Sequence, residues 1–124
     1  MTHRLISIAI CSVLLGSLPA SAHHALTAYN RNQSKTVEGV VKDYVYANPH
    51  ARIVLLVAGT DGNMAEWDFE GGSPRRLGPR GFTSSTIAKG DKVTVAYNPM
   101  RDGRPGGFFV GVKTADGKSY GTQR

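Results

Sequence analysis

Three of the four histidines lie where they could bind a metal ion together. His23 and His24 are adjacent, and His50 ends an Asn-Pro-His turn. A chain that began at His23 would offer its α-amine and an imidazole to one ion, and His24 or His50 would complete a set of nitrogen ligands. Of the first-row divalent ions, Cu(II) binds such ligands most tightly. The sequence therefore predicts a copper site at His23, His24 and His50.

The ligand set depends on where the mature chain begins. If Ala22 were the first residue, the amine, two backbone amides and the imidazole of His24 could surround Cu(II) in a plane without His50. Met64 and Met100 carry thioether sulfurs that suit Cu(I), although packing is the simpler account of both. Only a chain that begins at His23 leaves coordination positions for His50.

A second candidate surface lies near the single tryptophan and the glycine pair that follows the same predicted strand. It comprises Trp67, Glu70, Gly71, Gly72, Ser73 and Arg75. Small β-barrels can bind oligosaccharides on such a face, and the net charge of +6 favours anionic ligands. We expect Trp67 to be mostly buried, whereas an exposed Trp67 beside the glycines would favour this groove as the binding surface.

No catalytic constellation is apparent in the sequence. The one cysteine, Cys11, lies inside an apolar run, and the serines do not follow a nucleophile-elbow pattern. Glu66, Asp68 and Glu70 lie on one side of a predicted strand, where a row of carboxylates is usually a solvated face. We therefore expect a binding protein with no catalysis of its own. The alternative is a copper-dependent redox enzyme. It would need an open coordination position and a substrate surface, and the sequence shows neither.

Residues 1–22 have the layout of a signal peptide. Arg4 precedes an uncharged apolar run of about 14 residues, short of the roughly 20 that cross a bilayer as a helix. Ala20 and Ala22 then form the small-x-small pattern of a cleavage site. We expect cleavage after Ala22, a periplasmic or secreted location and no stable membrane anchor. The mature chain of roughly one hundred residues can then fold as one domain without disulfides.

The mature chain divides into a polar arm at residues 23–35 and one β-domain at residues 36–124. Strands are predicted at residues 36–46, 51–58, 64–70, 92–97 and 108–114, with a short extended piece at 118–120. Asp61 and Gly62 predict a tight hairpin turn, and Pro74 after Ser73 predicts the start of a short helix. Residues 83–88 are expected to add another helical turn.

This order predicts an all-β, OB-like, five-stranded Greek-key barrel with a short helical insert between strands three and four. The first strand is expected to coil strongly, with a bulge or sharp coil at Gly39. A small sandwich or an open β-roll has the same periodicity. The basic residues are scattered except at residues 75–80, a cluster that we interpret as a solvated loop, so we expect no nucleic-acid partner. The expected partners are a metal ion, a small anionic or oligosaccharide ligand, or a protein.

Five blocks of sequence carry a family resemblance: residues 22–24, 36–41, 48–50, 66–67 with 70–74, and 89–95. In these blocks the chain resembles a family of small exported bacterial proteins of a domain of unknown function, whose mature chains open with a His-His pair. The resemblance covers nearly the whole mature chain, although Ala25 and Phe82 stand where that family often has Ser and Trp. It implies a periplasmic location and an OB-like barrel, and it places His23, His24 and His50 in recurrent blocks.

Overall fold

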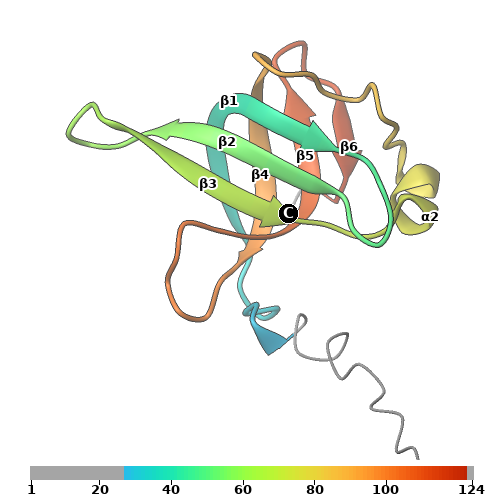
Figure 1. Cartoon of the computed structure of the whole chain (residues 1–124), viewed down its shortest axis with the longest axis horizontal. Coiled ribbons are helices and arrows are strands. Elements are labelled where there is room, and N and C mark those ends of the chain that lie inside the picture. Colours follow the sequence, from blue (N-terminus) through green and yellow to red (C-terminus); the bar gives the residue numbers. More distant parts are fainter. Residues whose placement is uncertain (1–26, 123–124) are drawn as a thin grey trace, which may run out of the picture.

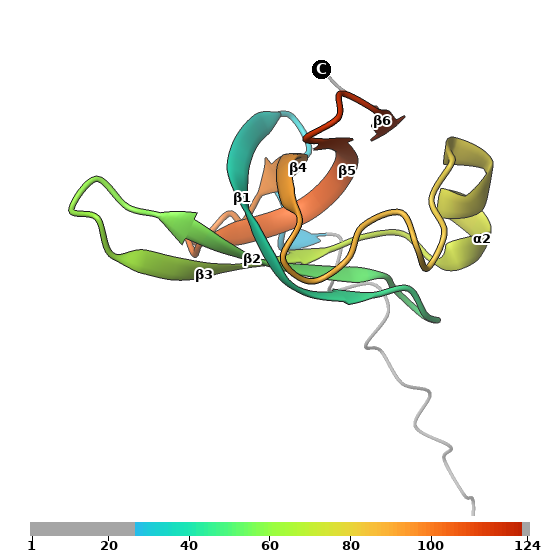
Figure 2. The ribbon, with the colours of Figure 1, turned by 90° about the horizontal axis from the view of Figure 1, so that it is seen from above.

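Five strands within residues 27–122, the part of the chain that the computed structural model describes, close into a barrel (Figures 1 and 2). They are β1 (Lys35–Val45), β2 (Arg52–Ala58), β3 (Met64–Glu70), β4 (Lys92–Pro99) and β5 (Gly106–Thr114), and the short β6 (Ser119–Gly121) pairs with β5. The insert between β3 and β4 contains α2 (Pro74–Leu77) and η1 (Gly78–Arg80). The predicted strand order and the helical insert are therefore confirmed.

The barrel closes through a parallel pairing of β3 with β5. The strands follow the order β3-β2-β1-β4-β5, and Asp68, Phe69 and Glu70 pair with Gly106, Gly107 and Phe108. All the other pairings are antiparallel. A three-stranded meander joined to the last two strands in this way is the OB-type arrangement, which excludes the sandwich and the open roll.

The first strand belongs to both sides of the barrel and changes partner at Val40. Its first half pairs with β4 and its second half with β2. Gly39 lies at this bend, where an added Cβ would be 2.7 Å from the carbonyl oxygen of Leu56. The coil predicted at the glycine is present. The bulge is not at Gly39, however, because the register shifts between Val41 and Asp43.

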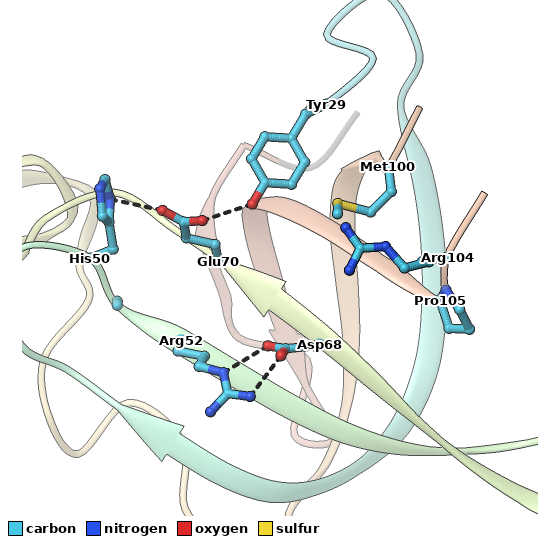
Figure 3. A pocket seen from close by; sticks show the side chains of 9 residues that line it. Tyr29, His50, Arg52, Asp68, Glu70, Met100, Arg104 and Pro105 are labelled. Carbon is cyan, nitrogen blue, oxygen red and sulfur yellow. Dashed lines mark hydrogen bonds and ion pairs between the residues drawn. The ribbon is translucent and has the colours of Figure 1, made fainter. Parts of the chain in front are cut away.

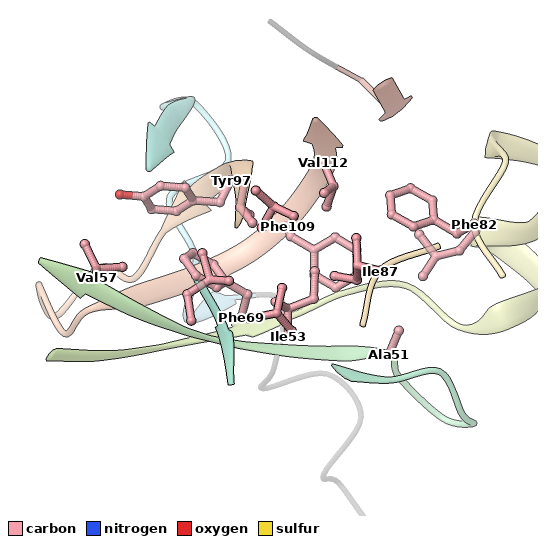
Figure 4. Packing of buried hydrophobic residues seen from close by; sticks show 14 residues of the cluster. Ala51, Ile53, Val57, Phe69, Phe82, Ile87, Tyr97, Phe109 and Val112 are labelled. Carbon is pink, nitrogen blue, oxygen red and sulfur yellow. The ribbon is translucent and has the colours of Figure 1, made fainter. Parts of the chain in front are cut away.

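The core fills the barrel and extends toward the insert (Figure 4). Its largest fully buried side chains are Phe69, Phe82, Phe109, Ile53, Leu55, Val41, Val93, Val95 and Val112. Phe69 is buried while Glu66 and Asp68 on the same strand are exposed, which confirms the predicted alternation of β3. Trp67 is partly buried and packs against the core, edge-on to Tyr97.

The insert covers one end of the barrel with apolar side chains. Leu77 from α2 is 3% exposed, and Phe82, just after η1, is 1% exposed and packs against Phe109. The helical turn expected at residues 83–88 is absent. The segment instead forms a turn in which Thr86 N–H donates to the carbonyl of Thr83. Within residues 27–122, no helix has the length and apolarity to span a membrane.

The described part of the predicted polar arm packs against the barrel. Tyr29 is 7% exposed and forms an isolated bridge with Met100. Asn30 N–H donates to the carbonyl of Pro99 at 2.8 Å, and Arg101 N–H donates to the carbonyl of Ala28 at 2.9 Å. Little in the sequence indicates this contact, because Tyr29 is the one aromatic residue in the otherwise polar stretch of residues 23–35. These contacts hold Ala28, Tyr29 and Asn30 against the start of the β4–β5 loop.

Candidate functional site

A pocket of about 470 Å³ lies between the β1–β2 loop, the ends of β2 and β3, and the β4–β5 loop (Figure 3). Its lining residues are Tyr29, His50, Ala51, Arg52, Asp68, Glu70, Met100, Arg104 and Pro105. The face of strands two and three, with the loops 1–2 and 4–5, is where OB-type barrels bind ligands. The pocket is therefore the first place in the described residues to look for function.

Glu70 joins residues from two distant segments at this pocket. Tyr29 O–H donates to Glu70 Oε2 at 2.8 Å, and Glu70 Oε1 lies 3.4 Å from His50 Nδ1. Figure 3 shows the Glu70 carboxylate between the two rings, with one oxygen toward each. The carboxylate thus links the N-terminal segment to the β1–β2 loop.

The Tyr29 phenol is held in its neutral, donating form. Its burial, and then its hydrogen bond to Glu70, raise the pKa of Tyr29 well above the usual tyrosine range. Proton transfer by this phenol near neutral pH is therefore unfavourable. Tyr29 acts as a fixed donor that orients Glu70.

The hydrogen bonds of His50 determine which ring nitrogen is left for a ligand. His50 Nδ1 lies 3.1 Å from the carbonyl oxygen of Gly71, and a carbonyl can only accept a hydrogen bond. Nδ1 must therefore carry the proton in the neutral ring, which leaves the lone pair on Nε2. Metal-binding histidines are commonly oriented in this way, by a carbonyl or carboxylate at the other ring nitrogen. The side chain of His50 is 46% exposed, so a ligand can approach it.

Backbone hydrogen bonds place His50 beside the end of β3. Gly71 N–H donates to the carbonyl of Ala51 at 2.8 Å, and Ala51 N–H donates to the carbonyl of Gly72 at 3.0 Å. Ala51 follows His50 directly and is completely buried. The position of the imidazole therefore follows from the packing of the loop.

The remaining polar side chains of the pocket are largely paired. Arg52 donates two hydrogen bonds to Asp68, at 2.8 and 2.6 Å, and this pairing raises the pKa of Arg52. Arg104 pairs with Asp102 at 2.7 Å. Met100, at the start of the β4–β5 loop, also lines the pocket, and its thioether sulfur could contact a soft metal ion there (Figure 3). His50, Glu70 and Met100 remain as the side chains that could contact a metal ion.

The structure places one of the three predicted metal ligands in this pocket. His50 is there with Glu70, whereas His23 and His24 lie outside the described residues. Within residues 27–122, no cluster of three or more His, Cys, Asp or Glu side chains could hold a metal ion. Met64 is 55% exposed at the start of β3 and does not line the pocket that contains Met100.

The residues of the second predicted surface do not share one pocket. Trp67, Glu70 and Gly72 line three different pockets. Gly71 is buried against Phe109, where an added Cβ would lie 2.2 Å from the ring. Ser73 caps α2 without a side-chain hydrogen bond, and Arg75 is exposed on that helix. Trp67 is neither fully buried nor exposed beside the glycines.

Sequence reasoning missed Tyr29 and Arg104 at the pocket. Tyr29 is an aromatic residue in a polar segment, and that contrast was the only available signal. Arg104 lies in the turn-rich β4–β5 loop, whose composition predicts a loop without indicating which face of the barrel it covers. Both residues reach the pocket through contacts between distant parts of the chain.

Comparison with known proteins identifies a family but no activity. A family model described as "Family of unknown function (DUF6152)" matches residues 10–109. No curated protein and no solved structure matches the chain.

Proposed function

The chain belongs to a family of unknown function (DUF6152), so its role must be inferred from its own residues, and we propose that it is a small copper-binding module without catalysis of its own. The copper ligands would be His50 together with His23 and His24. One observation carries the proposal: His50 lines a pocket with its Nδ1 held by the Gly71 carbonyl, which leaves Nε2 to bind a metal.

The path of the chain supports the participation of the N-terminal histidines. Tyr29 is anchored in the same pocket through Glu70, which also lies beside His50. His24 precedes Tyr29 by only five residues, and five residues of extended chain span at most about 18 Å. A segment of that length permits His23 and His24 to reach the pocket in which Tyr29 is anchored.

The donor set favours copper over other common metals. A terminal amine and imidazoles form the nitrogen-rich set that Cu(II) prefers. The thioether of Met100, which lines the same pocket as His50, suits Cu(I). A free amine on His23 requires removal of residues 1–22. The proposal therefore also places the working protein outside the cytoplasm, in the periplasm or secreted.

The decisive experiment is a Cu(II) titration of protein recovered from the periplasm, with its N-terminus established by intact mass. We expect one equivalent to bind, and His50→Ala to weaken that binding by at least about tenfold, comparable to the loss of a positioning partner at a metal site. Electron paramagnetic resonance should show fewer coordinated nitrogens in His50→Ala. Binding should also weaken as the pH falls, because the ligands must be deprotonated.

Two methionines provide a matched control for the Cu(I) state. Met100 lines the pocket and Met64 does not, so Met100→Leu should weaken Cu(I) binding while Met64→Leu should not. If His50→Ala binds Cu(II) as tightly as the wild type, the N-terminal histidines form a simple terminal chelate and the proposed site is wrong. Recovery of the chain with residues 1–22 still attached would exclude the amine ligand.

A further inference from the structure

A second pocket, of about 420 Å³, lies on the other side of Tyr29, between the N-terminal segment, the α2–η1 insert and β5. Three arginines line it, each from a different segment: Arg31 from the arm, Arg76 from α2 and Arg80 from η1. Arg31 is distant in sequence from Arg76 and Arg80, which lie on successive helical turns. The fold brings all three side chains to one pocket.

Within residues 27–122, none of these three arginines has an acidic partner. The ion pairs in the described part of the chain involve other cations, including Arg52 and Arg104, and none involves Arg31, Arg76 or Arg80. No aspartate or glutamate of residues 27–122 lines the pocket. The positive charge at this pocket is therefore not neutralised by a carboxylate within it, and an anion there would gain charge-assisted hydrogen bonds.

The floor of the pocket is apolar. Phe108 and Val110 of β5 are partly exposed there, and Leu77 and Phe109 lie beneath as core residues. The ring of Phe108 packs against the ring of Tyr29, with 5.6 Å between the ring centroids. A ligand can therefore place an apolar body on the Phe108 side and its charge among the arginines.

We infer that this pocket binds a small organic anion, a carboxylate or phosphate that carries an apolar or aromatic group. The arginines and the neutral polar residues that also line the pocket, among them Asn32, Gln33, Ser34 and Asn98, can hydrogen-bond the anionic group, while Phe108 and Val110 contact its apolar part. This site is separate from the proposed copper site, since His50 and Glu70 do not line it. Arg75, which the sequence analysis assigned to the second candidate surface, lies on α2 beside Arg76 but does not line this pocket.

The test uses 2-naphthyl phosphate as the probe, measured by isothermal titration calorimetry with metal-free protein. The comparison ligands are 2-naphthol, which lacks the charge, and inorganic phosphate, which lacks the ring. Arg76→Ala and Arg80→Ala test the pocket. Arg75→Ala is the matched control, because it removes the same charge from the same exposed helix without altering the lining.

We expect saturable binding of 2-naphthyl phosphate, tighter than that of either comparison ligand. Arg76→Ala and Arg80→Ala should each weaken it about fivefold, roughly 1 kcal/mol, whereas Arg75→Ala and His50→Ala should leave it unchanged. Added salt should weaken binding, because the arginines are exposed. The inference is overturned if 2-naphthyl phosphate shows no saturable binding, if 2-naphthol binds as tightly, or if Arg75→Ala weakens binding as much as Arg76→Ala.

Discussion

Replacement of Gly71 by alanine should destabilise the barrel and disturb the proposed copper site together. The added Cβ would lie 2.2 Å from Cε1 and Cζ of Phe109, whereas carbon atoms rest at about 3.5–4.0 Å. The contact must therefore open by more than about 1 Å. The Gly71 carbonyl also accepts the hydrogen bond of His50 Nδ1, so a shift of this backbone would move the imidazole.

The expected cost follows from the packing of Phe109. This ring is 1% exposed and packs on Phe82 with 5.8 Å between the ring centroids, so it has little room to retreat. Overpacking of a core costs typically about 1–3 kcal/mol, and we expect Gly71→Ala to fall near 3 kcal/mol. In a domain of about one hundred residues, a loss of that size lowers the Tm by more than about 10 °C.

Gly72→Ala is the matched control for this substitution. Its added Cβ would meet the Arg76 Cβ at 3.4 Å, close to ordinary contact, and neither Gly71 nor Gly72 has a positive φ. We expect the free energy of unfolding of Gly72→Ala to stay within about 1 kcal/mol of the wild type. Urea unfolding, followed by circular dichroism and by the fluorescence of Trp67, the single tryptophan, measures both variants.

The comparison of these two variants can refute the reasoning. If Gly71→Ala unfolds at the same urea concentration as Gly72→Ala, then contact with Phe109 is not what requires a glycine at position 71. If Gly71→Ala loses stability but binds Cu(II) as tightly as the wild type, the Gly71 carbonyl does not position His50 for metal binding.

Two further predictions concern side chains around the pocket. Because the pKa of Tyr29 is raised in the folded state, an unfolded chain ionises first as the pH rises, and stability should fall above about pH 10. Tyr29→Phe, which loses the hydrogen bond to Glu70, should cost about 1–2 kcal/mol at pH 7. Burial also raises the pKa values of Tyr44 and Tyr97, so Tyr29→Phe should lose less stability than the wild type above about pH 10 but should still lose some. Equal losses in urea titrations would exclude a contribution from Tyr29. Arg52→Ala breaks the ion pair with Asp68, whose partners are 53% and 55% exposed, so its cost should be below about 1 kcal/mol and should shrink in high salt. A larger cost that persists in high salt would contradict that estimate.

Much of the fold could be predicted because its signals are local. The alternation of β3 placed Phe69 inward and Asp68 outward, and the Asp61–Gly62 pair predicted the β2–β3 turn, where Gly62 has a φ of 81°. Pro74 predicted the start of α2. Each of these features depends on a few neighbouring residues, so it can be predicted from the local sequence pattern.

The candidate site was predicted only in part. His50 was predicted as a metal ligand and lies in the pocket, but its contacts with Gly71 and Glu70 depend on how the β1–β2 loop packs against the end of β3. Trp67 and Gly72, which are close in sequence, line different pockets because the strand ends and the chain turns between them.

The amino-acid sequence by itself determined the strands, the helical insert and the OB-like order of elements, because periodicity and turn chemistry act over a few residues. Only the tertiary structure decided that Tyr29 is buried against the barrel, that Glu70 lies between Tyr29 and His50, and that Arg31 faces the insert that carries Arg76. These contacts join residues tens of positions apart. They arise from the closure of the barrel and the packing of its loops, which local sequence patterns do not encode.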